Sequence, residues 1–165
     1  MALARDLLDQ ADHLAALDTR RPKQANLRRA VSSAYYALFH LLTDEGSRLL
    51  PATPLGLQAR VTRAFAHEEM KQVCVSISGI PSAALHSLQP HGFSPQLKTV
   101  CKAFYELQEA RHKADYDISL PYARIDVLAL LRQTRNAFDA WALVRGTDEA
   151  RVFLIALLLS KKWSR

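Results

Sequence analysis

One segment constrains the fold more than any other, because it would be apolar on almost every side of a helix. Residues 27–42 read LRRAVSSAYYALFHLL, and their apolar positions follow a helical period while covering most of the circumference. A helix of this kind lies at the centre of a fold, surrounded by other elements. Helical periodicity recurs along the chain and strand-like alternation is almost absent, so we predict an all-α protein.

Proline, glycine and serine mark the ends of the predicted helices. Helices are expected at residues 2–17, 23–50, 55–76, 95–117 and 121–144, with a final helix after Gly146. Ser94 and Pro95 provide an N-cap and first-turn signal, and residues 78–95 form an irregular connection. We therefore predict one domain over residues 1–165, folded as an up-and-down bundle of five to six helices.

The composition favours a cytoplasmic protein without a metal or cofactor. Cys74 and Cys101 are too far apart to suggest a zinc motif or a disulfide framework, and both are expected to fill apolar space. The charged first turns do not resemble a signal peptide. His67 lacks a second histidine at the zincin spacing, and no Gly-rich phosphate loop is present.

The longest apolar run is VFLIALLL, residues 152–159, which is far shorter than a membrane span. We expect the helix over residues 148–163 to pack on its own domain or on a second subunit. Anchoring at a membrane surface is the weaker alternative. No membrane partner is predicted.

Positive charge is concentrated near the start of the central helix. The net charge is +6, and no acidic residue lies between Asp18 and Asp44. The basic patch between them consists of Arg20, Arg21, Lys23, Arg28 and Arg29. Such a patch suits an anionic partner such as RNA or a nucleotide, although a solvated surface would also account for it.

A polar stripe crosses the otherwise apolar central segment. Its members recur at helical spacing and are Arg29, Ser33, Tyr36 and His40. The stripe faces solvent at the edge of the bundle, or it lines a cleft in which its hydrogen bonds are satisfied.

A second anomaly lies at residues 109–117, EARHKADYD. The apolar positions of the preceding helix lead at the same phase to Arg111, so a guanidinium takes the place of a leucine. One interpretation is a simple i, i+4 ion pair with Asp115. The other is a ligand-binding cleft in which Arg111, Asp115 and Tyr116 face the polar stripe of the central helix.

The segments RRAVSSAYYALFH and RHKADY together resemble the HEPN domain of prokaryotic nucleotide-binding and toxin–antitoxin proteins, over about residues 1–145. The resemblance implies a helical bundle that forms a homodimer with its motif helices near the dimer cleft. It also implies RNA cleavage or nucleotide binding in a defence or toxin–antitoxin context, sometimes with a nucleotidyltransferase-like partner.

The sequence departs from the catalytic HEPN pattern. Ribonucleases of this family carry the motif arginine, then four to six intervening residues, then a histidine, and Tyr116, Asp117 and Ile118 occupy the possible histidine positions here. Tyrosine is a poor base at neutral pH, whereas histidine titrates near 6.5. If the protein is a nuclease, the candidate catalytic residues are Arg111 and Tyr116, with His40 or His112 in place of the missing histidine.

Three functions follow from these features. The favoured one is a homodimer that binds RNA or a nucleotide through a polar cleft and the basic patch. The cleft would consist of Arg29, Ser33, Tyr36, His40, Arg111, Asp115 and Tyr116. The alternatives are a metal-independent ribonuclease with a non-standard histidine and a non-catalytic scaffold protein.

Overall fold

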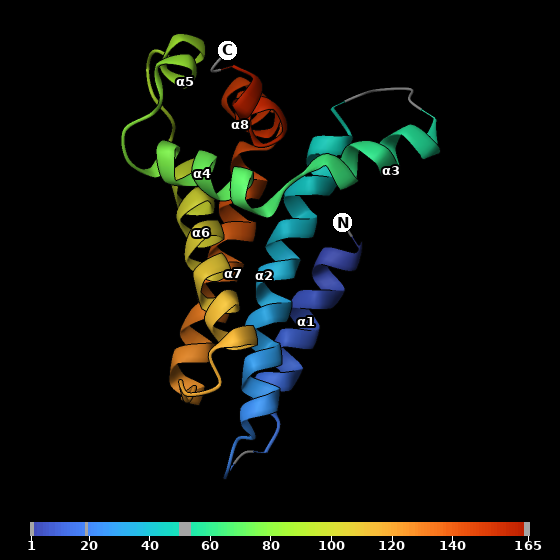
Figure 1. Ribbon diagram of the computed structural model, residues 1–165, viewed down its shortest axis with the longest axis vertical. Coiled ribbons are helices and arrows are strands. Elements are labelled where there is room, and N and C mark those ends of the chain that lie inside the picture. The colour runs from blue at the N-terminus through green and yellow to red at the C-terminus, as the bar shows by residue number, and fades with distance from the viewer. Residues whose placement is uncertain (1, 19, 50–53, 164–165) are drawn as a thin grey trace. The chain divides into compact units, whose positions relative to one another are not determined.

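All regular structure in the described part of the chain is helical. The computed structural model describes residues 2–18, 20–49 and 54–163, and Figure 1 shows their arrangement in helices. The helices are α1 (Ala2–Ala16), α2 (Gln24–Ser47), α3 (Leu55–Ala64), α4 (His67–Ser78), α5 (Ala83–Leu88), α6 (Pro95–Tyr116), α7 (Arg124–Val144) and α8 (Asp148–Leu159), followed by the 3-10 turn η1 (Ser160–Lys162). The prediction of an all-α helical bundle is confirmed.

The helices form two compact units. Unit 1 comprises residues 1–41 and 103–138, and unit 2 comprises residues 42–102 and 139–165. The boundary between them falls within α2, α6 and α7. The expectation of a single domain over residues 1–165 stays a prediction.

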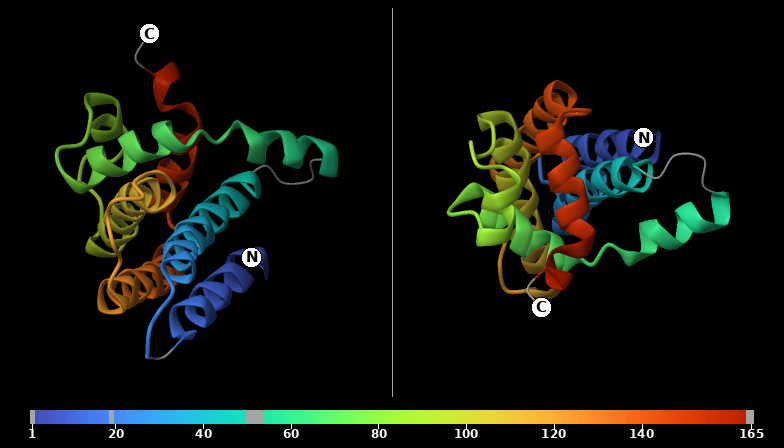
Figure 2. Two further views of the ribbon diagram at one scale, coloured as in Figure 1. Left: turned by 60° about the horizontal axis from the view of Figure 1, so that its bottom comes forward. Right: turned by 90° about the horizontal axis from the view of Figure 1, so that it is seen from above.

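Unit 1 is built around the N-terminal part of α2, as its apolar sequence predicts. Tyr35 is fully buried there, and its ring lies 5.6 Å from that of Phe104 on α6. Ala30 and Ala34 are also fully buried, and such small side chains let neighbouring helices approach α2 closely. Figures 1 and 2 show α1 running alongside this part of α2.

The predicted helix over residues 55–76 is wrong, because the chain breaks between α3 and α4. Phe65 and Ala66 are extended, with ψ angles of 116° and 127°. The Phe65 ring is buried against Gly46, where an added Cβ would lie only 2.5 Å from the ring. Burial of this ring competes with continuation of the helix, and helical periodicity alone does not reveal it.

Two further boundaries differ from expectation. The connection over residues 78–95 contains the short helix α5, whose N-cap Ser82 accepts a hydrogen bond from the backbone of the buried Leu85. Helix α7 begins at Arg124 instead of Pro121. With these corrections the described residues form eight α-helices, more than the five to six predicted. Ser94 does cap α6, accepting a hydrogen bond from the Leu97 amide at 3.2 Å.

Unit 2 buries much of the apolar C-terminal helix. Helix α8 packs against α4 and α5 of its own chain, with Phe153 and Leu157 fully buried. Cys74 and Cys101 are fully buried as free thiols, as expected, and burial together with the neighbouring Cys101 raises the pKa of Cys74. Among the described residues, no helix combines the length and the apolar character that crossing a membrane requires.

Candidate functional site

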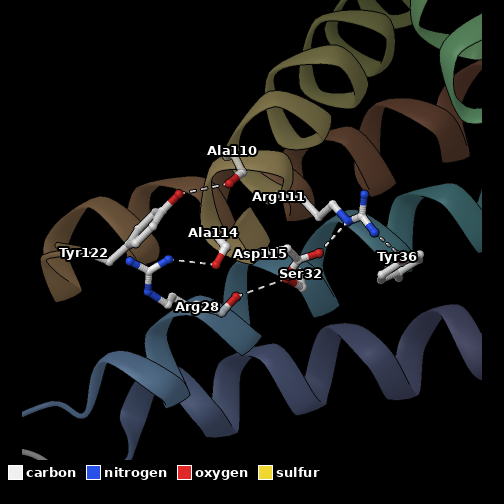
Figure 3. Close-up of polar contacts among 8 residues, drawn as sticks. All are labelled: Arg28, Ser32, Tyr36, Ala110, Arg111, Ala114, Asp115 and Tyr122. Carbon is white, nitrogen blue, oxygen red and sulfur yellow. Dashed lines mark hydrogen bonds and ion pairs between the residues drawn. The ribbon is translucent and has the colours of Figure 1, made fainter. Parts of the chain in front are cut away.

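Arg111 lies where the apolar side of α6 predicts, facing α2 within unit 1. Its Nη2 donates a hydrogen bond to the hydroxyl of Tyr36 at 2.8 Å. Its Nε forms an ion pair with Asp115 Oδ2 at 2.7 Å, and the two side chains are only 22% and 21% exposed. Figure 3 shows this arrangement. The expected contacts of Arg111 with Asp115 and with the α2 stripe are confirmed.

Ser32 completes the network, although the sequence pattern did not identify it as a site residue. Its hydroxyl donates to Asp115 Oδ1 at 2.6 Å, and the residue is 3% exposed (Figure 3). The predicted member, Ser33, instead donates to Gln10 of α1 at 3.1 Å. Two adjacent serines on one helix therefore serve different neighbours, and spacing alone could not separate their roles.

The surroundings of Arg111 preserve its charge. Burial tends to lower the pKa of Arg111, but Tyr36 and Asp115 together raise it above its usual value. Its guanidinium carbon lies 5.4 Å from the centre of the Tyr36 ring and 5.9 Å from that of Tyr116. Tyr116 is 66% exposed and contacts His112, so it flanks the network on the solvent side.

Tyr36 also lines a groove between α1 and α2. The groove has a volume of about 440 Å³. Helix α1 supplies Leu3, Leu7, Gln10 and Leu14, and α2 supplies Arg29, Ser32, Ser33, Tyr36 and His40. All four members of the predicted polar stripe therefore line a groove. Tyr36 and Ser32 belong both to this groove and to the Arg111 network.

His40 lies on the wall of the groove with its ring half-buried. The ring centre lies 6.4 Å from that of Tyr36 and 5.5 Å from that of Phe39. Burial lowers the pKa of His40 from its usual 6.5. The groove therefore contains a neutral imidazole at neutral pH, which can accept a proton or lie flat against an aromatic base.

The lowered pKa of His40 predicts a loss of stability in mild acid. Below about pH 6.5 this histidine takes up a proton in the unfolded chain more readily than in the folded protein. The free energy of unfolding therefore falls as the pH drops toward the folded pKa. Urea unfolding between pH 7.5 and 5 should show a weaker dependence in His40→Gln than in the native protein. The exposed control His86→Gln should match the native protein, and equal slopes in all three would contradict this assignment.

The basic patch divides into one structural and four exposed members. Arg28 donates to the backbone oxygen of Ala114 at 2.8 Å, and its guanidinium lies 5.6 Å from the centre of the Tyr122 ring (Figure 3). It also donates to the backbone oxygen of Leu120 at 2.6 Å. It thus neutralises the C-terminal end of α6, where a cation is favourable. The interpretation of Arg28 as a phosphate-binding residue does not account for these contacts.

The other members of the patch remain accessible to an anion. Arg20, Arg21, Lys23 and Arg29 are all exposed. Lys23 lies 3.9 Å from Asp18, a long ion pair. Within residues 2–18, 20–49 and 54–163 no carboxylate pairs with Arg20, Arg21 or Arg29.

Arg28→Ala is expected to lower the free energy of unfolding by about 1–3 kcal/mol, because two backbone carbonyls lose a charged donor. Equilibrium unfolding in urea measures this change. Arg21→Ala is the matched control, and an exposed arginine of this kind should alter stability by less than about 0.5 kcal/mol. Equal effects of the two substitutions would show that Arg28 does not stabilise the end of α6.

Tyr122 is a further residue that sequence analysis did not identify. Its hydroxyl donates to the Ala110 oxygen at 2.9 Å, and its backbone exchanges hydrogen bonds with the side chain of Gln24. Burial raises the pKa of Tyr122. It therefore joins the segment after α6 to the start of α2 and positions Arg28.

Comparison with protein-family models, curated proteins and solved structures found no match. The HEPN resemblance thus stays a prediction. Within the described residues, no group of histidine, cysteine or carboxylate side chains is placed to hold a metal ion.

Proposed function

We propose that the α1–α2 groove of unit 1 binds a nucleotide or a short stretch of single-stranded RNA. One observation carries this proposal. A single groove combines an apolar wall on α1, the rings of Tyr36 and His40, and the exposed cation Arg29. Proteins that bind single strands use the same combination of stacking surfaces and positive charge.

Each wall of the groove has a distinct role in this proposal. A base stacks on Tyr36 or His40 and is covered on its other side by Leu7 or Leu14. The adjoining phosphate pairs with Arg29, and Arg20 and Arg21 extend the positive surface along the strand. Ser33 supplies a hydroxyl for a base edge or a ribose.

Arg111 acts on the groove through Tyr36. The hydrogen bond from its Nη2 and the position of its guanidinium beside the ring fix the orientation of Tyr36. Asp115 in turn fixes the guanidinium. We therefore assign Arg111 and Asp115 as positioning residues for the stacking surface, with Tyr116 at its exposed edge.

The HEPN resemblance supports the same function and adds its setting. A HEPN-like homodimer would bring two such sites together, and a defence or toxin–antitoxin role with a nucleotidyltransferase-like partner would follow. These points extend the proposal beyond the groove itself.

Fluorescence anisotropy with a labelled single-stranded RNA tests the proposed binding. Affinity should fall steeply as salt is raised, because Arg29 and its neighbours release counterions on binding. Arg29→Glu should weaken binding at least about tenfold, whereas Arg132→Glu, an exposed change on α7, should have a much smaller effect. Binding that is insensitive to salt and equal in both variants would favour the scaffold function.

A metal-independent ribonuclease is the second candidate, and one observation favours it. Burial keeps His40 neutral at neutral pH, so its imidazole could take the proton of a 2′-hydroxyl bound in the groove. Incubation with RNA in EDTA separates the candidates. Cleavage that disappears in His40→Gln supports the nuclease, and intact RNA in the presence of binding supports the binding function.

A further inference from the structure

A second concave site lies in unit 2, at the ends of α2 and α7 and the first turn of α8. The pocket has a volume of about 230 Å³. It is smaller than the roughly 300–1,000 Å³ typical of sites for drug-sized ligands, so its occupant must be small. Apolar walls come from Leu49, Trp141 and Leu154, and positive charge comes from Arg48, Arg145 and Arg151.

Each of the three arginines is held by a carboxylate, and each guanidinium keeps N–H donors that the carboxylate does not use. Arg145 Nη2 pairs with Glu45 at 3.0 Å, and Arg151 Nη1 pairs with Asp148 at 2.7 Å. Arg48 pairs with Asp44 at 3.1 Å. A guanidinium has five N–H donors, and these side chains remain 45–59% exposed, so each keeps donors for a further acceptor.

Trp141 provides an independent sign of a missing acceptor. The residue is 2% exposed and contributes to the pocket lining. Its Nε1 is buried and has no hydrogen-bond partner among the described residues. An indole N–H can only donate, and buried donors are normally paired. At the start of α8, by contrast, the Ala150 amide already has an acceptor, because it donates to the Thr147 hydroxyl.

We propose that this pocket binds a small phosphate-bearing ligand. A tetrahedral oxyanion presents acceptors in several directions, which suits guanidinium groups that converge from three places in the chain. Glu45 is the single acidic residue in the described lining, and Asp44 and Asp148, which pair with Arg48 and Arg151, are not part of it. This site is independent of the groove in unit 1.

Trp141 also provides the means of testing the proposal. The chain has two tryptophans, and Trp163→Phe leaves Trp141 as the sole indole emitter. Titration of this variant with inorganic phosphate should give a saturable change in emission and a higher melting temperature. Sodium chloride at matched ionic strength should give neither effect.

Substitution of the exposed arginine keeps the test specific. Arg151→Gln removes a side chain that is 59% exposed and should leave the fold intact by circular dichroism. It should raise the dissociation constant for phosphate at least about tenfold, whereas Arg132→Gln on α7 should not change it. No saturable response to phosphate in either measurement, or equal affinity in both variants, would overturn the proposal. A labelled RNA that binds with no loss in Arg151→Gln would show that the pocket takes a free phosphate ligand and not the strand.

Discussion

Arg111→Ala is expected to lower the free energy of unfolding by about 2–3 kcal/mol. The substitution leaves the carboxylate of Asp115, which is 21% exposed, with Ser32 as its remaining partner in the network. Removing one member of a buried ion pair costs about 3–5 kcal/mol, and partial exposure reduces that figure here. Equilibrium unfolding in urea at pH 7 measures the change directly.

Two companion variants identify the cause of this loss. Arg111→Lys should recover little of it, because an ammonium cannot reach both Tyr36 and Asp115 in the geometry of the planar fork. A double-mutant cycle with Asp115→Ala should give a coupling energy above about 1 kcal/mol. A coupling below about 0.5 kcal/mol, as for an exposed i, i+4 pair, would contradict the buried network.

Tyr36→Ala is expected to weaken RNA binding by about ten- to a hundredfold. The tyrosine ring, which the groove shares with the Arg111 network, is the proposed stacking surface, and stacking contributes about 1–3 kcal/mol per base. Anisotropy titration with the labelled RNA measures the loss. Circular dichroism establishes that the variant is folded.

Tyr36→Phe distinguishes stacking from hydrogen bonding at this position. Phenylalanine retains the ring but removes the hydroxyl that accepts from Arg111 at 2.8 Å. Binding should therefore fall much less than in Tyr36→Ala, while stability falls by about 1–3 kcal/mol. If the two variants bind RNA equally, the ring of Tyr36 does not contact the ligand.

The sequence predicts the helices well and the breaks between them poorly. The apolar period of residues 27–42 places Tyr35 and Leu38 in the core, where both are fully buried. The interruption at Phe65 depends on the contact of its ring with Gly46, nineteen residues away, and such packing leaves no local signal. Periodicity reports which side of a helix is buried, and a buried ring elsewhere decides whether the helix continues.

The candidate site was predictable to the level of a helix face. The phase of α6 predicted that Arg111 turns inward, and it contacts Tyr36 of α2. The stripe of α2 was compatible with solvent or with a cleft, and the structure places Tyr36 and His40 in a groove. The roles of Ser32 and Arg28 were not predictable, because each depends on a partner more than eighty residues away. The sequence alone does not show whether a basic residue stabilises the end of a helix or is available to bind an anion.

Photo-crosslinking tests the central claim, that RNA lies in the α1–α2 groove, most directly. A short single-stranded RNA carrying 5-iodouridine is irradiated with the native protein, and the modified peptides are identified by mass spectrometry. We predict crosslinks to Tyr36 or His40, lost when excess unlabelled RNA competes and reduced in Arg29→Glu. Specific crosslinks confined to α7 or to unit 2, with none on α1 or α2, would contradict the account.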